Sequence, residues 1–102
     1  MNTDVLKTEL GTMIVRTPGI LGGKPRIKGH RVGVHRVAGW WKLGLSVEEI
    51  GKRLTTLTPA EIHAALAHYH LHHEDMEAQM AAEEAESDRI QQEHLRLQKR
   101  GA

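Results

Sequence analysis

The chain has 102 residues and no cysteine, which excludes disulfide bonds, thiolate zinc sites and a cysteine nucleophile. Its formal net charge of +1 combines two opposite halves, because residues 1–53 carry a balance of +6 and residues 54–102 a balance of −5. Such asymmetry suggests two different partners, one of them a polyanion, although an ordinary solvated surface explains it equally well.

No run of about eighteen apolar residues occurs, so we expect no membrane-spanning segment. The N-terminal stretch MNTDVLKTELG lacks the apolar core of a signal peptide. We therefore expect a cytoplasmic protein built on one small domain. A core of that size is modest, and dimerisation or a partner is a natural source of further stability.

The first predicted elements are strands. Residues 13–17, MIVRT, predict a short strand that Pro18 and Gly19 end. The stretch RIKGHRVGV then predicts a small β-hairpin. Its segment 28–31 suits a tight turn, because Gly29 adopts a positive φ without a Cβ penalty.

A helix is predicted over residues 34–43, where apolar residues recur at helical spacing and Gly44 supplies the stop. Trp41 continues the apolar stripe of this helix, so we expect it in the core. Trp40 lies about 100° away around the helix axis. We expect Trp40 either at a dimer or partner surface, where Trp is enriched, or simply partly exposed.

Two capping boxes predict the starts of two further helices. SVEE places Ser46 at the N-cap with Glu49 three residues later, and TPAE does the same with Thr58 and Glu61. After its first turn the third helix contains no Pro or Gly, so we expect it to run unbroken towards Lys99. Its buried side is predicted to carry Ile62, Ala65, Leu66, Tyr69 and Met76.

Together these elements predict a mainly α fold: short N-terminal β-strands forming a hairpin, a three-helix helix-turn-helix-like unit and a long C-terminal helix. Residues 1–75 form the strand and helix-turn-helix-like domain, and residues 76–102 form a charged helical tail. Three-helix units of this kind also occur in proteins that never contact DNA, so the pattern alone does not decide whether this unit binds DNA.

Several kinds of chemistry are not predicted. The tripeptide GGK is followed by Pro25 and no helix begins there, which argues against a phosphate-binding loop. His68 and His72 stand four residues apart in HAALAHYHLHH, but a third ligand and an H-E-x-x-H pattern are missing, so we predict no metal site. No nucleophile and base or converging carboxylates emerge, and we expect no enzyme and no cofactor.

Basic residues concentrate between the first strand and the second helix and predict a phosphate-contacting surface. Strand alternation places Arg26 and Lys28 on the face opposite Ile27. The third helix offers no Arg, Lys, Asn or Gln in its first turns, so we expect the strands to supply much of any DNA contact. The predicted DNA-binding residues are Arg26, Lys28, His30, Arg31, Arg36, Lys52 and Arg53.

The tail reverses its charge along its length. Residues 74–88 contain seven acidic residues and no Lys or Arg, and four basic residues follow. A 4/3-spaced apolar seam runs through the tail, but polar residues interrupt it, so it is too weak for a stable autonomous coiled coil. The tail is either a solvated helix or a segment that orders on a partner. The predicted partner-binding residues are Met76, Met80, Arg89, Ile90, Arg96 and Leu97.

The stretch PGILGGKPRIKGHRVGV is similar to the signature P-G-I-x-G-G-K-P-x-I-x-G-T-R-I-P-V of a family of small prokaryotic proteins, the domain of unknown function 433. The resemblance continues through LGLSVEEIGKRLTTLTPAEIHAALAHYHLH, where the family shows G-x-S-x-E-E-I, L-T-x-E-D-I and A-L-x-Y. It covers about residues 13–75. His30 stands where the family has Thr, Gly33 where it has Pro, and His68 where it has Tyr.

Members of that family are commonly regarded as VapB-like antitoxins of type II toxin–antitoxin systems, paired with PIN-like ribonuclease toxins. The resemblance therefore implies a DNA-binding antitoxin, expected to be a homodimer. Such a protein represses its own operon at operator DNA and neutralises its toxin through residues beyond about 70. The alternative is a non-DNA-binding interaction or adaptor module that uses the same helices. An enzyme or metalloprotein is the least favoured reading.

Overall fold

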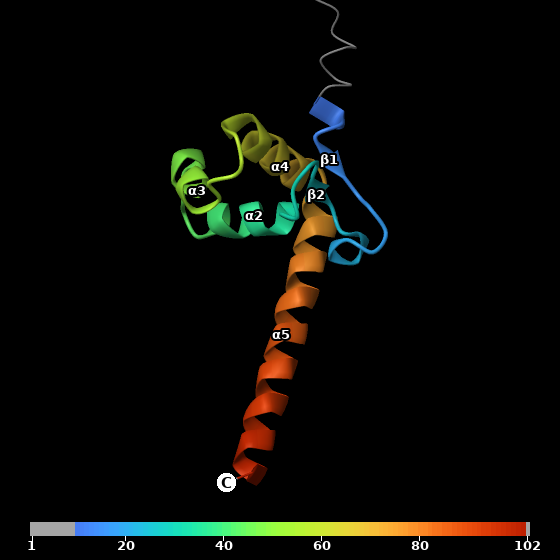
Figure 1. The fold of residues 1–102 in the computed structure, drawn as a ribbon, viewed down its shortest axis with the longest axis vertical. Coiled ribbons are helices and arrows are strands. Elements are labelled where there is room, and N and C mark those ends of the chain that lie inside the picture. The colour runs from blue at the N-terminus through green and yellow to red at the C-terminus, as the bar shows by residue number, and fades with distance from the viewer. Residues whose placement is uncertain (1–9, 102) are drawn as a thin grey trace, which may run out of the picture. The chain divides into compact units, whose positions relative to one another are not determined.

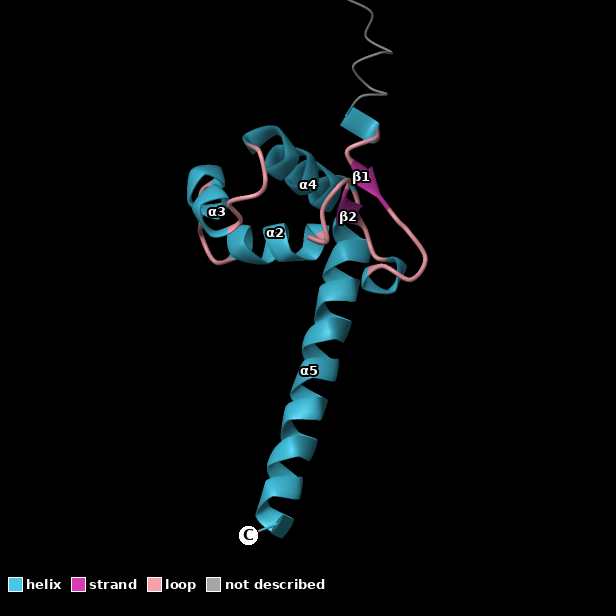
Figure 2. Ribbon diagram, in the orientation of Figure 1, coloured by secondary structure: helices cyan, strands magenta, loops and turns pink. Residues whose placement is uncertain are grey.

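The computed structural model describes the backbone of residues 10–101 and the side chains of residues 10–99. It is mainly helical, with two short strands near its N-terminal end and a long helix at its C-terminal end, as predicted (Figures 1 and 2). The elements are β1 Ile14–Val15, the 3-10 turn η1 Leu21–Gly23, β2 Arg26–Ile27, α2 Val34–Lys42, α3 Val47–Arg53, α4 Pro59–Leu71 and α5 His73–Gly101. The chain divides into two compact units between His72 and His73.

Within RIKGHRVGV, where the sequence predicts a hairpin, only an isolated bridge joins Arg26 to Gly33. The N-terminal hairpin of the structure is instead formed by β1 and β2. They pair antiparallel, with Ile14 opposite Ile27. A tight turn follows β2 directly, in which the His30 N–H donates to the Ile27 carbonyl at 3.0 Å. Gly29 is the third residue of this turn and has a φ of 85°. A positive φ at that position is the type II geometry, which favours glycine.

Both predicted capping boxes are present. The Ser46 hydroxyl accepts the Glu49 N–H, and the Glu49 carboxylate accepts the Ser46 N–H, each at 3.1 Å. At the start of α4, Glu61 accepts the Thr58 N–H at 2.8 Å and Thr58 accepts the Glu61 N–H at 3.2 Å. Each reciprocal pair satisfies two backbone donors that have no partner inside the helix. α3 and α4 therefore begin where the sequence predicts.

α4 is the central element of the first unit, because it packs on α2, on α3 and on both strands (Figure 1). The buried residues of the three helices are Val34, Val37, Ala38, Ile50, Ile62, Ala65, Leu66 and Tyr69. Full burial of a Val, Leu or Ile side chain contributes about 1.5–3 kcal/mol, so this cluster is a main source of the unit's stability.

Trp41 lies at the rim of this core, and the prediction that it is a core residue is wrong. Its side chain is 40% exposed. The ring packs edge-on against His70, with centroids 4.9 Å apart, and lies tilted beside Tyr69 at 6.0 Å. Trp41 stands in the last turn of α2, which ends at Lys42, so no further turn of that helix covers it.

The third predicted helix is not continuous, which is a second correction. α4 ends at Leu71, and His72 has a φ of −114° and a ψ of 41°, outside the helical region. α5 then begins at His73 and spans 29 residues. No Gly or Pro marks the break, so the usual stop signals of a sequence are missing there. None of the described helices is long and apolar enough to span a membrane.

Candidate DNA-contacting and partner-binding surfaces

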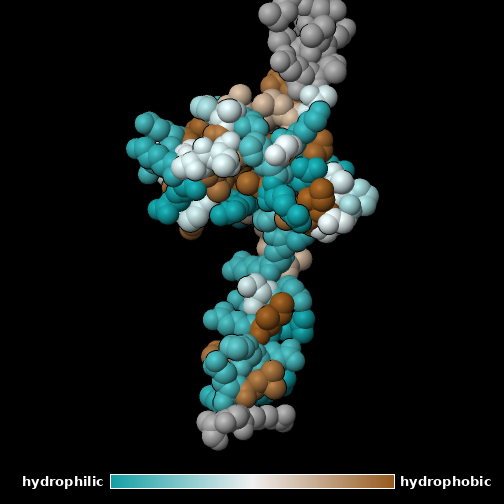
Figure 3. Space-filling view, viewed as in Figure 1, coloured by the Kyte–Doolittle hydropathy of each residue, from teal (hydrophilic) through white to brown (hydrophobic). Residues whose placement is uncertain are grey.

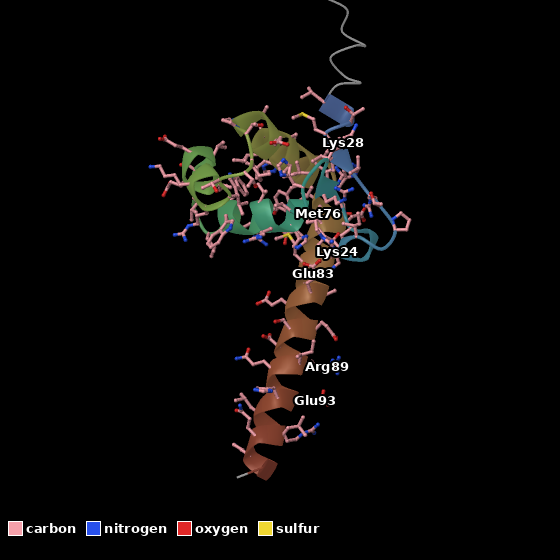
Figure 4. The ribbon with its side chains drawn as sticks, in the orientation of Figure 1. Lys24, Lys28, Met76, Glu83, Arg89 and Glu93 are labelled. Atoms are coloured by element: carbon pink, nitrogen blue, oxygen red, sulfur yellow. The ribbon has the colours of Figure 1, made fainter. Side chains whose placement is uncertain are left out.

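The tight turn after β2 presents two of the predicted DNA-contacting cations. Lys28 and Arg31 are both exposed there, and Lys28 is labelled in Figure 4. They flank Gly29, whose backbone conformation makes the turn. Exposed cations on a tight turn are suited to contact phosphate oxygens without base selectivity.

Arg26 occupies a different position, because its guanidinium is engaged within the fold. One terminal nitrogen donates to the His30 carbonyl and the other to the Thr17 hydroxyl, each at 3.0 Å. The side chain is half-buried. Arg26 therefore closes the turn onto the residues that follow β1, and it shapes the surface on which Lys28 and Arg31 stand.

His30 joins the same turn to α4. Its Nε2 lies 2.9 Å from Glu61 Oε2, and both side chains are largely covered. Glu61 also closes the α4 capping box, so its two carboxylate oxygens serve two different partners. The pKa of Glu61 is lowered, chiefly by the hydrogen bond from the Thr58 backbone and to a smaller extent by the Thr58 hydroxyl and His30. His30 acts as an anchor between the two elements.

Three further predicted cations lie on α2 and α3. Arg36, Lys52 and Arg53 are all exposed. The Arg53 guanidinium lies over the Trp40 ring, 4.7 Å from its centroid, as in a cation–π contact. Sequence reasoning missed this pair, because the residues lie on different helices. Trp40 is half-buried, and Arg53 of its own chain covers one face of its ring.

The outer face of α4 lacks base-reading side chains. Its exposed residues after the first turn are His63, Ala67, His70 and Leu71. Arg, Asn and Gln make the bidentate contacts that discriminate bases in the major groove, and α4 presents none of them. The described outer face of α4 therefore offers no side chain suited to base-selective contacts.

The histidine-rich end of α4 does not assemble a metal centre. The rings of His68 and His72 lie tilted against each other, with centroids 4.5 Å apart. Burial lowers the pKa of His68, and the neighbouring His72 and Arg16 lower it further. Among the residues that the structure describes, no group of three or more His, Asp or Glu is placed to hold a metal ion.

α5 carries the predicted partner-binding residues in two different environments. Met76 is only 2% exposed and Met80 is half-buried, whereas Ile90 and Leu97 are 55% and 56% exposed. Figure 3 shows hydrophobic patches separated by hydrophilic residues along this helix. The exposed part of the predicted seam therefore begins beyond Met80.

The predicted arginines of α5 are embedded in local ion pairs. Arg89 contacts Glu86 at 2.6 Å and Glu93 at 3.7 Å, one turn away on either side. Figure 4 labels Arg89 and Glu93 on α5. These pairs are exposed, so each stabilises the helix only slightly. Arg96 is exposed as well.

The family model of DUF433, described as a protein of unknown function, matches residues 14–69. The chain belongs to the DUF433 family. The matched segment runs from β1 almost to the end of α4, so the hairpin, both capping boxes and the buried stripe of α4 all lie within the DUF433 region. α5 lies outside it.

A solved structure supports the same fold for this DUF433 chain. The crystal structure of a DUF433 member protein from Anabaena variabilis ATCC 29413 superposes with a TM-score of 0.63 at 23% sequence identity. The match covers 79% of this chain and 86% of that one. At this identity the likeness concerns the fold alone. No curated protein matches the sequence.

Proposed function

We propose that this DUF433 protein is a DNA-binding antitoxin of a type II toxin–antitoxin system. Its first unit binds the operator of its own operon, and α5 neutralises a PIN-like ribonuclease toxin. The proposal rests on the resemblance of its glycine-rich segment to VapB-like antitoxins and on the distribution of charge described above. It implies a protein that acts by binding, with no catalytic step and no cofactor, in the cytoplasm.

The separation of exposed charge is the observation that carries the proposal. Lys28, Arg31, Arg36 and Lys52 are exposed cations of the first unit. α5 instead opens with an acidic segment, residues 74–88, that contains no Lys or Arg. A cationic surface suits a phosphate backbone, and an acidic helix suits the cationic rim of an RNA-cleaving enzyme.

Binding to DNA is expected to depend mainly on phosphate contacts. α4 has the position of a recognition helix after α3 but offers only imidazoles, alanine and leucine on its outer face. The affinity should therefore fall steeply with salt and discriminate weakly between base sequences.

A gel-shift titration with the protein's own promoter tests the DNA-binding half. Lys28→Ala/Arg31→Ala/Arg36→Ala should weaken binding and reduce the salt slope, because three phosphate contacts are removed. The matched control is Arg89→Ala/Arg96→Ala/Lys99→Ala, which changes net charge equally but on α5. Equal affinity of the two triple variants, each folded by circular dichroism, would show that this surface does not bind DNA.

Truncation after Glu83 tests the toxin-neutralising half. Residues from 84 onward are exposed wherever their side chains are described, so their removal leaves the core of the first unit intact. The truncated protein should still shift promoter DNA but should fail to inhibit the ribonuclease encoded beside it. Full inhibition by the truncated protein would contradict this role of α5.

One observation favours a second candidate, an adaptor module that does not bind DNA. Trp41, Leu43 and Leu71 are 40%, 74% and 81% exposed, at the ends of α2 and α4. Large exposed apolar side chains often mark protein–protein contacts. If no promoter fragment is shifted at low salt, and Trp41→Ala/Leu43→Ser abolishes toxin inhibition, the adaptor reading is the correct one.

A further inference from the structure

Arg53, the last residue of α3, is held in place by a residue of another helix. Its guanidinium carbon lies 4.7 Å from the centroid of the Trp40 ring, within the range of a cation–π contact. An exposed arginine ordinarily samples many rotamers. The indole removes part of that freedom before any ligand binds, which lowers the entropic cost of binding.

The N–H groups of Arg53 are left available to a ligand. Its side chain is exposed, and no residue that the structure describes forms a hydrogen bond or an ion pair with its guanidinium. Arg26 provides the contrast, because its terminal nitrogens already donate to the His30 carbonyl and the Thr17 hydroxyl. A guanidinium carries five N–H donors in a fixed planar geometry. Arg53 thus combines a restrained position with unused donors.

Two sources of negative charge lie beside Arg53 and make it a poor phosphate site. The pKa of Glu49, one turn earlier in α3, is lowered chiefly by its hydrogen bonds with Ser46 and further by attraction to Lys52 and Arg53. Arg53 also stands in the last turn of α3, at the negative end of the helix dipole. Both repel a phosphate more than an uncharged base edge. Lys52 lies about 100° away around the α3 axis and stays suited to phosphate.

We propose that Arg53, held over the Trp40 ring, reads a base of the DNA and donates two hydrogen bonds to O6 and N7 of a guanine in the major groove. The proposal rests on the proposed DNA-binding function and adds the base that it selects. A paired contact of arginine with guanine is the commonest base-specific contact in that groove. Trp40 acts through Arg53 and is a positioning residue.

The course of α2 connects this contact with the phosphate-contacting cations. α2 begins after the turn that carries Lys28 and Arg31 and ends beside α3 (Figure 1). Arg36 and Trp40 are four residues apart in α2, so they share a face of that helix. The nine residues of α2 span about 14 Å at 1.5 Å per residue, well within one turn of B-DNA, about 34 Å. A duplex that contacts this face therefore reaches both Arg36 and Arg53.

A chemically modified promoter tests the guanine contact directly. Replacing guanine by 7-deazaguanine in the protein's own promoter removes the N7 acceptor and leaves base pairing and phosphates in place. In an anisotropy titration, the full natural chain should bind the modified fragment about fivefold or more weakly than the unmodified one. Arg53→Met should bind the unmodified fragment more weakly than the natural chain does, and should bind both fragments equally.

Arg36→Met is the matched control, because it removes the same exposed charge from a residue assigned to phosphate. It should weaken binding to both fragments by the same factor and so preserve the difference between them. Equal affinity of the natural chain for both fragments, or an undiminished difference in Arg53→Met, would overturn the guanine contact while leaving DNA binding intact. Failure to bind either fragment at low salt would overturn the proposed DNA-binding function and this inference with it.

Substitutions of Trp40 test its positioning role. Trp40→Leu should reduce the difference in affinity between the two fragments, because Arg53 loses the ring that holds it. Trp40→Phe should preserve more of that difference, since a phenyl ring still offers a face to the cation. A purely structural role of Trp40 would lower the thermal stability of both variants and leave the difference between fragments unchanged. That result would show that Trp40 does not position Arg53.

Discussion

His30 Nε2 lies 2.9 Å from Glu61 Oε2, and this contact joins the turn after β2 to the first turn of α4 across 31 residues of sequence. Glu61 also forms the α4 cap, since its other carboxylate oxygen accepts the Thr58 N–H. The turn that presents Lys28 and Arg31 is therefore fixed to the helix that organises the core. Rigid placement of exposed cations is what a phosphate-contacting surface requires.

Comparing the two capping boxes separates the contribution of the His30–Glu61 contact to the free energy of unfolding from that of the cap itself. Glu61→Ala should destabilise the protein by about 1–2 kcal/mol, because it removes a cap and a side-chain hydrogen bond. Glu49→Ala removes the equivalent cap at α3, which has no histidine partner, and should cost less than Glu61→Ala. Urea unfolding at pH 7 compares the two. Equal losses would mean that the His30 contact contributes nothing measurable.

Acidification should remove the contribution of Glu61 to the stability of the protein over a defined pH range. Its folded-state pKa lies below the ordinary value of 4.5, so the folded protein binds the proton less readily than the unfolded chain. The associated stability is fully present above that ordinary value and is lost as the pH falls through the folded-state pKa. In urea unfolding below pH 5, Glu61→Gln should therefore lose less stability than the natural chain. A parallel loss in both proteins would contradict this assignment.

The lowered pKa of His68 predicts a second pH range, higher than that of Glu61, over which the free energy of unfolding changes. Burial lowers its pKa below 6.5, so the neutral ring is favoured in the folded state. The stability that this represents is present above pH 6.5 and is lost as the pH falls through the folded-state pKa. His68→Gln should flatten the change in unfolding free energy between pH 7 and pH 5. His63→Gln, an exposed histidine on the same helix, is the control and should leave that change intact.

Arg26 and Lys28 should behave oppositely although both were predicted to bind DNA. Arg26→Ala removes hydrogen bonds to the Thr17 hydroxyl and the His30 carbonyl, so it should destabilise the protein by about 1–3 kcal/mol. Lys28→Ala removes an exposed charge and should change stability by less than about 0.5 kcal/mol. Thermal unfolding monitored by circular dichroism separates the two. Destabilisation by Lys28→Ala of the same size would show that the turn depends on charge, not on Arg26.

What the sequence predicts correctly here is local. The capping boxes involve residues three positions apart, the turn at Gly29 involves four consecutive residues, and the buried stripe of α4 follows the helical period. Each can be recognised without knowing where any other element lies. For the same reason the short strands and the starts of α2, α3 and α4 could be predicted, whereas the pairing of β1 with β2 and the break between α4 and α5 could not.

What the sequence did not predict depends on packing between elements. The contacts of His30 with Glu61 and of Arg53 with Trp40 join different elements, and nothing in the intervening residues indicates them. Among the predicted DNA-binding residues, Arg26 and His30 are engaged within the fold whereas Lys28 and Arg31 are exposed, so the sequence could locate the candidate DNA surface only to a region. The exposure of Trp41 likewise depends on where α2 ends relative to α4.

Two glycines should respond oppositely to the same substitution. Gly29→Ala should destabilise the protein by about 1 kcal/mol, because its φ of 85° is unfavourable for a side chain although a Cβ would meet nothing within 4 Å. Gly39→Ala should stabilise it by about 0.5–1 kcal/mol, since this residue is helical and equally unobstructed. Chemical denaturation measures both. Destabilisation by Gly39→Ala would mean that α2 needs a glycine for close packing there.

Trp41 should contribute less to stability than a core residue of the same helix bundle. Its ring is 40% exposed and keeps contacts with Tyr69 and His70 on one side only, so Trp41→Ala should cost about 1–2 kcal/mol. Ile50→Ala removes a side chain with no exposed surface and should cost about 2–5 kcal/mol, although it deletes fewer atoms. Urea unfolding of both variants gives the comparison. A larger loss for Trp41→Ala than for Ile50→Ala would place the indole in the core after all, as its position in the apolar stripe of the sequence predicts.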